Sequence, residues 1–180
     1  DIYYFDNKDT VKFMELMQNP SSGKEYTFGS VKSDWFSVFE FDPIGYVKDD
    51  ENIDAAELLE TLIENQKLGN KLRRERGWET LSIVGWKFTP RYDGVDNRLE
   101  WAFTIKNDST GDNVINYHTK FLGRTGIIQA TLVAAPDILD ASVADFKKMV
   151  NEFSFSPGEK YSEYRKGDKV AEYGLAALIV

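Results

Sequence analysis

The sequence predicts an α+β domain built on an antiparallel sheet. Four strand-like segments follow one another along the second half of the chain, at residues 81–92, 98–106, 114–122 and 126–134. Short runs of turn-forming residues separate them, as in a meander of hairpin-connected strands. A long helical pattern precedes this meander and a shorter one follows it. Because helices and strands are grouped in this way rather than alternating, the class is α+β rather than α/β.

The first quarter of the chain adds elements in front of the meander. Thr10 is a suitable N-cap for a short helix that runs through Gln18, and the turn-forming residues 19–23 end it. Strand candidates follow at 26–31 and 35–41, with a third, short candidate at 45–48. The expected sheet therefore contains N-terminal strands as well as the four-strand meander.

The longest predicted helix begins at Asp54. Asp54 and Glu57 have the spacing of a capping box, and Gly77 supplies a C-terminal stop. We expect an apolar stripe to face the sheet, formed by Leu58, Leu59, Leu62, Gly69 and Leu72. A last helix over 142–152 spaces its apolar residues at three- and four-residue intervals, so we expect it to pack on the sheet as well.

Composition and charge narrow the classes of function. The chain has 180 residues, a formal net charge of −8 and no cysteine. Nucleic acids and anionic lipids would repel such a chain, so neither is an expected partner. Without cysteine there is no disulfide framework, thiol nucleophile or zinc–thiolate site. No motif implies a cofactor, and the length suits one domain.

Residues that catalysis would need are sparse. His118 is the only histidine, and it lies in mid-strand on the same face as Asn116 and Lys120. We therefore expect an exposed or hydrogen-bonded histidine rather than a catalytic one. A lysine replaces histidine as a base only when it is desolvated, and Lys48, Lys106 and Lys120 lie near turns or polar neighbours. We expect no catalytic residue.

The densest acidic run supplies two candidate binding residues, Asp49 and Asp50. Glu51 and Asp54 complete the run. Carboxylates grouped in a loop are suitable ligands for calcium, but the spacing matches no EF-hand loop. Acidic residues at a helix start also complement the helix dipole without any ligand. We therefore expect no metal site here.

Three further candidate binding residues belong to the first hairpin of the meander. Asp93 and Glu100 lie on its two limbs and are able to approach each other across the turn, as a pair of catalytic carboxylates would. Arg91 and Arg98 lie beside them and would keep their pKa values low, which makes them poor general acids. Ordinary cross-strand pairing explains the same pattern. Asp93, Glu100 and Arg91 are therefore candidates for binding.

Arg124 is the last candidate binding residue. It lies in the run Gly-Arg-Thr-Gly at 123–126, which joins two strands and opens no helix. The run therefore lacks the dipole that lets glycine loops bind anions, and a tight hairpin is expected. At the tip of that hairpin Arg124 would be placed to contact a partner.

A set of short motifs resembles one known family. The motifs, in order, are Gly45–Asp50, Val84-Gly85-Trp86, Pro90–Asp93, Leu99-Glu100-Trp101, Asn116-Tyr117, Leu122-Gly123-Arg124, Thr131–Ala134, Phe153–Gly158 and Gly167–Leu175. Together they resemble the bacterial membrane-anchored proteins of domain-of-unknown-function family 2167. The resemblance begins at about Trp35 and departs at His118, where the family pattern leads us to expect asparagine. At the level of element order the chain also resembles the Mog1/PsbP-type sandwich, which transfers no function.

The family resemblance implies an exported protein of the bacterial cell envelope. It implies a removed signal peptide, one soluble domain over residues 1–165 outside the cytoplasm, and a segment over 166–180 that leads to a C-terminal membrane anchor. From composition alone, the apolar run 173–180 reads instead as a terminal strand or helix packed on the core. The family has no established activity, so the resemblance carries over no catalytic residue.

Three functional hypotheses follow. The leading one is a non-enzymatic, membrane-anchored module that binds a protein or small molecule. The alternatives are a carboxylate-dependent hydrolase and a structural component of the envelope. A pocket with two or more desolvated carboxylates would favour the enzyme, and a large exposed apolar patch would favour the binding module.

Overall fold

A single seven-stranded antiparallel sheet organises the computed structural model, which describes residues 2–180. Its strands lie in the order β1-β2-β3-β7-β6-β5-β4, so the meander predicted from the sequence forms one half of the sheet. The strands are β1 (Ile2–Phe5), β2 (Tyr26–Ser30), β3 (Trp35–Asp42), β4 (Leu81–Asp93), β5 (Arg98–Asn107), β6 (Asn113–Leu122) and β7 (Ile127–Ala134). The α+β class and the antiparallel meander are therefore confirmed.

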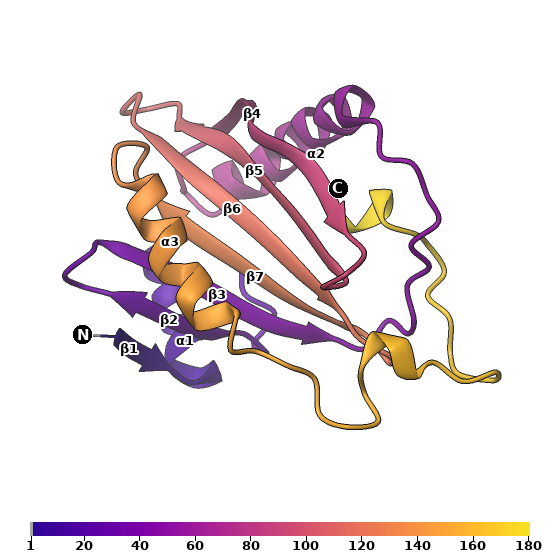
Figure 1. Cartoon of the computed structure of the whole chain (residues 1–180). Helices are drawn as coiled ribbons and strands as arrows, with labels where there is room; N and C mark the ends of the chain where they lie inside the picture. Colours follow the sequence, from indigo (N-terminus) through magenta and orange to yellow (C-terminus); the bar gives the residue numbers. More distant parts are fainter. Residues whose placement is uncertain (1) are drawn as a thin grey trace.

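Helices cover both faces of this sheet (Figure 1). They are α1 (Asn7–Leu16), α2 (Ala55–Glu75) and α3 (Leu139–Val150), and two short 3-10 helices follow, η1 (Tyr161–Glu163) and η2 (Ala176–Leu178). The helix α3 lies across one face, which we call the α3 face. The helices α1 and α2 lie on the opposite face, which we call the α1/α2 face. None of the helices in the described part of the chain has both the length and the apolar character needed to span a membrane.

The two faces have separate apolar cores. On the α3 face, Phe146 and Leu132 are fully buried, together with Tyr117 from the middle of the sheet. On the α1/α2 face, Leu58 and Leu62 of α2 pack in a cluster that also contains buried residues of β5. Because side chains alternate along a strand, β5, β6 and β7 contribute to both faces. The wide sheet is thus held between two layers of helices.

The capping residues predicted for α1 and α2 can be compared with those in the structure. Asp54 caps α2 as predicted, since its side chain accepts the backbone N–H groups of Ala56 and Glu57. Gly77 ends the helix with φ +71°, a conformation that favours glycine. Thr10 is not the cap of α1; Asp6 is, and its carboxylate accepts the N–H of Asp9.

The structure also explains the position of Thr10 and differs from two predicted boundaries. Thr10 is fully buried, and its hydroxyl contacts Thr27 Oγ1 at 3.1 Å, which explains why a polar residue lies inside the helix. No strand forms at 45–48, where Tyr46 makes one isolated parallel bridge to Val170. The helix α3 starts three residues before Ser142.

The last residues of the chain pack on the α1/α2 face. Leu175, Leu178 and Ile179 are buried in the same cluster as Leu58 and Leu62. The N–H of Ala176 donates to the Glu51 carboxylate at 2.8 Å, which ties this segment to the loop before α2. Leu175, Leu178 and Ile179 therefore form part of the core, whereas Tyr173 and Val180 are about half exposed.

Candidate functional site

A groove runs along the α1/α2 face where α1 and α2 leave the sheet uncovered. It consists of two neighbouring cavities of about 270 and 400 Å³. Four residues line both cavities and mark where they join: Asn19, Phe36, Asn116 and Val133. Since these residues come from the loop after α1 and from β3, β6 and β7, the groove crosses the middle of the sheet. We call the two cavities together the groove.

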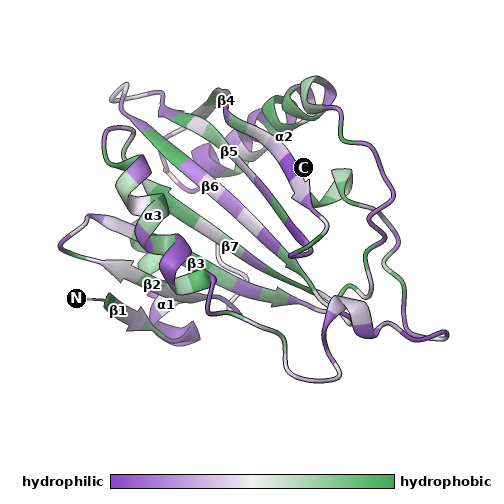
Figure 2. Cartoon of the chain, in the orientation of Figure 1, coloured by the Kyte–Doolittle hydropathy of each residue, from purple (hydrophilic) through white to green (hydrophobic). Residues whose placement is uncertain are grey.

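The floor of the groove follows from strand register. Three rows of directly opposed residues cross β6, β7 and β3 on this face: Asn116–Val133–Phe36, His118–Thr131–Val38 and Lys120–Gln129–Glu40. Hydrophilic positions therefore run through the middle of β6, as Figure 2 shows. The first two rows mix apolar and polar side chains, and the third is entirely polar.

The polar row forms a continuous hydrogen-bonded chain, which we call the polar ladder. The ammonium of Lys120 donates to Gln129 Oε1, and Gln129 Nε2 donates to Glu40 Oε2 at 3.0 Å. Ser22 Oγ then donates to Glu40 Oε1 at 2.8 Å, and the N–H of Ser22 donates to Glu25 Oε1 at 2.7 Å. The ladder therefore connects β6 to the loop after α1 through β7 and β3.

Lys120 is a desolvated amine, contrary to the prediction from its polar neighbours. Burial lowers its pKa to about 8, although the nearby carboxylates of Asp42 and Glu40 act in the opposite direction. Its ammonium also lies over the Trp101 ring, 5.9 Å from the centroid. The polar neighbours are real, but the low-dielectric surroundings outweigh them in setting the pKa. At neutral pH the residue is still mainly a cation.

His118 shares the face of Asn116 and Lys120, as predicted, but it is not simply exposed. Its ring stacks on Trp101 with 4.9 Å between the centroids, and its Nδ1 lies 3.0 Å from Thr131 Oγ1. Burial lowers the pKa of His118 to about 3, so the ring is neutral at physiological pH. Its Nε2 is buried and has no hydrogen-bond partner among the described residues. The Nε2 atom of His118 is therefore an unpaired hydrogen-bonding atom beside the smaller cavity.

The loop after α1 covers one end of the groove. The Glu25 carboxylate accepts the N–H groups of Ser22, Gly23 and Lys24 and the Ser21 hydroxyl. Burial alone would raise the pKa of Glu25, but these hydrogen bonds outweigh it and hold the pKa below its ordinary value. An ionised carboxylate thus organises the loop. Such a bond set requires no ligand to explain it.

The other end of the groove is built by α2 and β4. Arg73 Nε and Nη1 donate to the carbonyls of Glu79 and Gln18, at 2.5 and 2.7 Å. Asn70 pairs with both backbone groups of Leu81. These bonds correct the predicted apolar stripe, because Asn70 and Arg73 are buried while Leu72 is 43% exposed. Polar anchoring to the edge strand replaces apolar contact over the second half of α2.

The carboxylates of the first hairpin lie away from the groove. Arg91 is directly opposite Glu100 and Asp93 is directly opposite Arg98, so Asp93 and Glu100 are diagonal neighbours on the α3 face. Glu100 forms ion pairs of 3.6 Å with Arg98 and with Lys147 of α3. The pKa of Asp93 is lowered, chiefly by the N–H of Val95. The structure places these residues in ordinary cross-strand pairing.

The carboxylates of the acidic run before α2 each contact a different partner or surface. Asp49 accepts the Tyr92 hydroxyl at 3.0 Å, Glu51 accepts the N–H of Ala176, and Asp54 caps the helix. Asp50 lines a shallow hollow together with Glu51 and residues 170–174. Among residues 2–180, no three histidine or carboxylate side chains are grouped in a way that would hold a metal ion.

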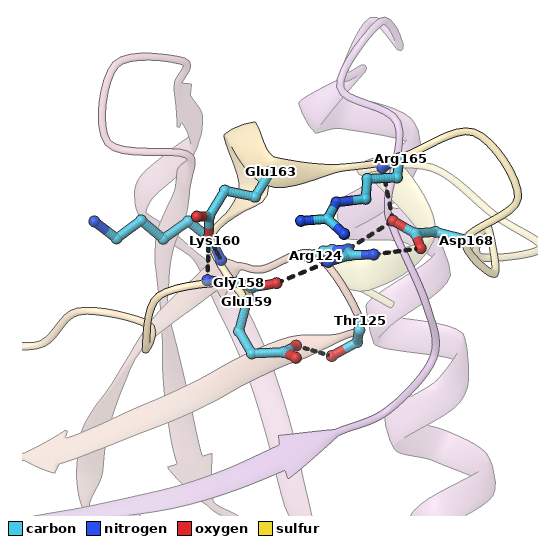
Figure 3. Close-up of polar contacts among 8 residues, drawn as sticks. All are labelled: Arg124, Thr125, Gly158, Glu159, Lys160, Glu163, Arg165 and Asp168. Atoms are coloured by element: carbon cyan, nitrogen blue, oxygen red, sulfur yellow. Dashed lines mark hydrogen bonds and ion pairs between the residues drawn. The ribbon is translucent and has the colours of Figure 1, made fainter.

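Arg124 holds the C-terminal segment 158–168, which we call the tail, onto the β6–β7 hairpin (Figure 3). Its Nε and Nη2 both lie 2.7 Å from the carboxylate of Asp168, and its Nη1 donates to the carbonyl of Gly158. The pKa of Asp168 falls to about 2, first because of the hydrogen bonds from Arg124. The predicted tight hairpin is present, but its arginine contacts this chain's own tail.

The residues of the polar ladder were not predicted. Gln129, Glu40 and Glu25 are ordinary polar residues in the sequence, and no spacing connects them. The one available signal was the alternation of the polar residues Asn116, His118 and Lys120 in a strand with a buried reverse face.

Comparison with known sequences gives a family but no activity. A search of curated proteins found no match to this chain. A family model described as "Protein of unknown function (DUF2167)" matches residues 1–180, the whole of the chain. The chain therefore belongs to this family of proteins of unknown function.

Proposed function

We propose that this chain is a non-enzymatic binding module whose ligand site is the groove on the α1/α2 face. The observation that carries the proposal is an amphipathic groove crossing the middle of the sheet, beside a neutral histidine with an unpaired nitrogen. Concave sites that combine apolar walls with a few convergent polar groups are where proteins usually bind small ligands. The groove has both components.

The charges around the groove favour a neutral or cationic ligand. The carboxylates lining it are Glu25, Glu40, Glu79 and Asp112. Among the described residues, Arg73 is the one cation that lines it, and two of its nitrogens already donate to carbonyls; the Lys120 ammonium lies behind Gln129 and donates to it. An anion would therefore meet a net negative potential, whereas an amine or an uncharged polar group would not. Phe36 and Val133 would contact the apolar part of the ligand.

The absence of a catalytic role is part of this proposal. The carboxyl groups with resolved pKa shifts, such as Glu25 and Asp93, are all shifted downwards, which makes them poor general acids at neutral pH. Lys120 contacts Gln129 rather than a serine or threonine that it would activate. A carboxylate-dependent hydrolase remains the alternative, and a structural envelope component is a third.

We further propose that the domain is anchored at the bacterial cell envelope, outside the cytoplasm. The support is the resemblance of the motifs, above all Gly167–Leu175, to membrane-anchored proteins. We also propose a Mog1/PsbP-like sandwich at the level of element order. The parent gene tests the anchor: an apolar span encoded after Val180 is expected, and a stop codon or polar tail there would contradict it.

A ligand screen with a groove-filling variant tests the site. Thermal unfolding would be measured with a panel of amino acids, dipeptides, simple sugars, aliphatic amines and small carboxylates. A neutral or cationic member at about a hundredfold excess over its Kd should raise Tm by about 5–10 °C. Val133→Trp should abolish this shift because the indole would occupy the groove.

Thr104→Trp is the matched control. Thr104 is half-buried on the opposite face of the same sheet, so this variant should keep the shift. A ligand that stabilises Val133→Trp as much as the parent would show that the site lies elsewhere. Stabilisation by the carboxylates alone would contradict the proposed ligand class.

A further inference from the structure

The two edges of the sheet differ in how they resist pairing with another strand. The β4 edge carries three register irregularities, and Lys87, Pro90 and Arg91 lie along it. Irregular pairing, charge and proline are the devices that protect an edge strand. The opposite edge, β1, consists of Ile2, Tyr3, Tyr4 and Phe5. Apart from being short, β1 has none of these devices.

Apolar surface continues from the β1 edge onto the α3 face. Ile2 is 58% exposed, Tyr4 53% and Tyr26 40%. The Tyr4 ring stacks on Tyr26 and lies 5.1 Å from Phe28, centroid to centroid. The helix α3 lies over the middle of the sheet and leaves this corner open (Figure 1). An unprotected edge therefore coincides with exposed aromatic surface.

We propose that β1 pairs antiparallel with β1 of a second copy of this chain, across a twofold axis normal to the sheet. This axis puts the α3 faces of both copies on the same side of the joined sheet. Directly opposed residues must then point to the same face, so the sum of their residue numbers is even. In the register that adds to eight, Tyr4 lies opposite Tyr4 of the second copy and Tyr3 opposite its Phe5. The Tyr4–Tyr4 pair then covers the exposed corner of the α3 face, and the two symmetry-related Tyr3–Phe5 pairs lie on the opposite face.

In this register the charged residue next to β1 does not face its own copy across the axis. Asp6 follows β1 directly and would lie opposite Ile2 of the second copy, so the two Asp6 side chains do not face each other. The strand is therefore its own complement, and an isologous contact closes after two copies. The net charge of −8 on each copy opposes association, so raising the salt concentration should strengthen the dimer.

Self-association is the first measurement. The contact is small, so sedimentation equilibrium should give a dimer with Kd on the order of tens of micromolar. Tyr4→Lys should shift the chain to monomer while its circular dichroism spectrum stays that of a folded protein, because Tyr4 is 53% exposed. Val84→Lys, 61% exposed on the β4 edge, is the matched control and should remain dimeric. A parent chain that stays monomeric at about ten times that concentration overturns the proposal.

Disulfide trapping tests the register, because the chain contains no cysteine. Tyr4→Cys should form a covalent dimer under mild oxidation, since directly opposed strand residues have Cα separations that a disulfide can span. Val84→Cys gives the rate of random collisions, and Tyr4→Cys should react about tenfold faster or more. Equal rates for the two variants would contradict this pairing. This inference is independent of the ligand groove.

Discussion

The two faces of the sheet use the same strands for opposite purposes. On the α3 face, β6 and β7 contribute Tyr117 and Leu132, which are 4% and 0% exposed and pack against Phe146 of α3. The adjacent residues of the same strands, His118 and Thr131, lie on the α1/α2 face beside open cavities. In the middle of these two strands the α3 face is apolar except for the buried Thr119, whereas polar residues predominate on the α1/α2 face.

This difference indicates where the function resides. A polar row on a half-buried sheet is an inefficient way to stabilise a fold, because each group needs a hydrogen-bond partner to offset its lost hydration. Departures from local folding rules are expected where a protein binds or reacts. Over β6 and β7, the residues on the α3 face therefore serve mainly stability, and those on the α1/α2 face serve the proposed binding.

The largest expected effect comes from truncating the α3 face. Phe146→Ala should lower the free energy of unfolding by about 3–5 kcal/mol, because Phe146 is fully buried and its loss leaves a cavity. Met14→Ala, which enlarges the groove, should cost about 1 kcal/mol or less. Urea unfolding of both variants measures the contrast. Equal losses would contradict the division of roles between the faces.

The loop over the groove should be the next most sensitive. Glu25→Ala should lower stability at pH 7 by about 2–3 kcal/mol, because backbone donors in the loop lose their acceptor. The folded pKa of Glu25 is depressed, so its contribution is present above the unfolded pKa and is lost as pH falls through the folded value. Stability should therefore differ between parent and variant at pH 7 and converge at low pH. Glu15→Ala, on an exposed part of α1, is the control.

Lys120 should make stability depend on pH in the alkaline range. Its folded pKa of about 8 lies below that of an unfolded lysine, so only the unfolded chain holds the proton between the two values. The destabilisation from Lys120 is therefore present below pH 8 and fades as pH rises.

Relative to Lys120→Met, the parent should gain about 1–2 kcal/mol between pH 8 and pH 10. Urea unfolding of both proteins across this range checks the gain. Lys106→Met, at an exposed position of β5, should show no such trend. An NMR titration of the Lys120 side chain with a midpoint near 10.5 would refute the premise.

His118 should make stability depend on pH in the acid range. Its folded pKa of about 3 lies below the unfolded value of about 6.5, so stability attributable to the neutral ring is lost as pH falls below 6.5. His118→Asn should remove about 2 kcal/mol of this acid destabilisation at pH 5. If the His118 ring titrates near pH 6.5 by NMR, it is solvated rather than buried.

The elements were predictable where the signal is local. Asp54 was identified as a cap because of its spacing to Glu57, and the meander because turn residues separate the strand segments. Thr10 and Leu72 were misplaced for a different reason. Thr10 is buried because its hydroxyl bonds to Thr27, and Leu72 is exposed because Asn70 instead faces the edge strand β4; a helical pattern reveals neither.

The groove was not predictable because its contacts are long-range. Gln129 and Glu40 are 89 residues apart in sequence, and only strand order brings them into one row. The desolvation of Lys120 likewise depends on Trp101 from another strand. The predicted candidates Asp49, Asp93, Glu100 and Arg124 stood out by local charge, and the structure assigns each an internal contact.

An NMR titration tests the central claim most directly. The isotope-labelled domain would be titrated with whichever amine, peptide or sugar raises Tm in the screen. If the groove is the site, the largest chemical-shift changes should lie at Asn116, His118 and Val133, and the α3-face residues Leu132 and Phe146 should change little. Largest changes on the α3 face or around the acidic run before α2 would contradict the account.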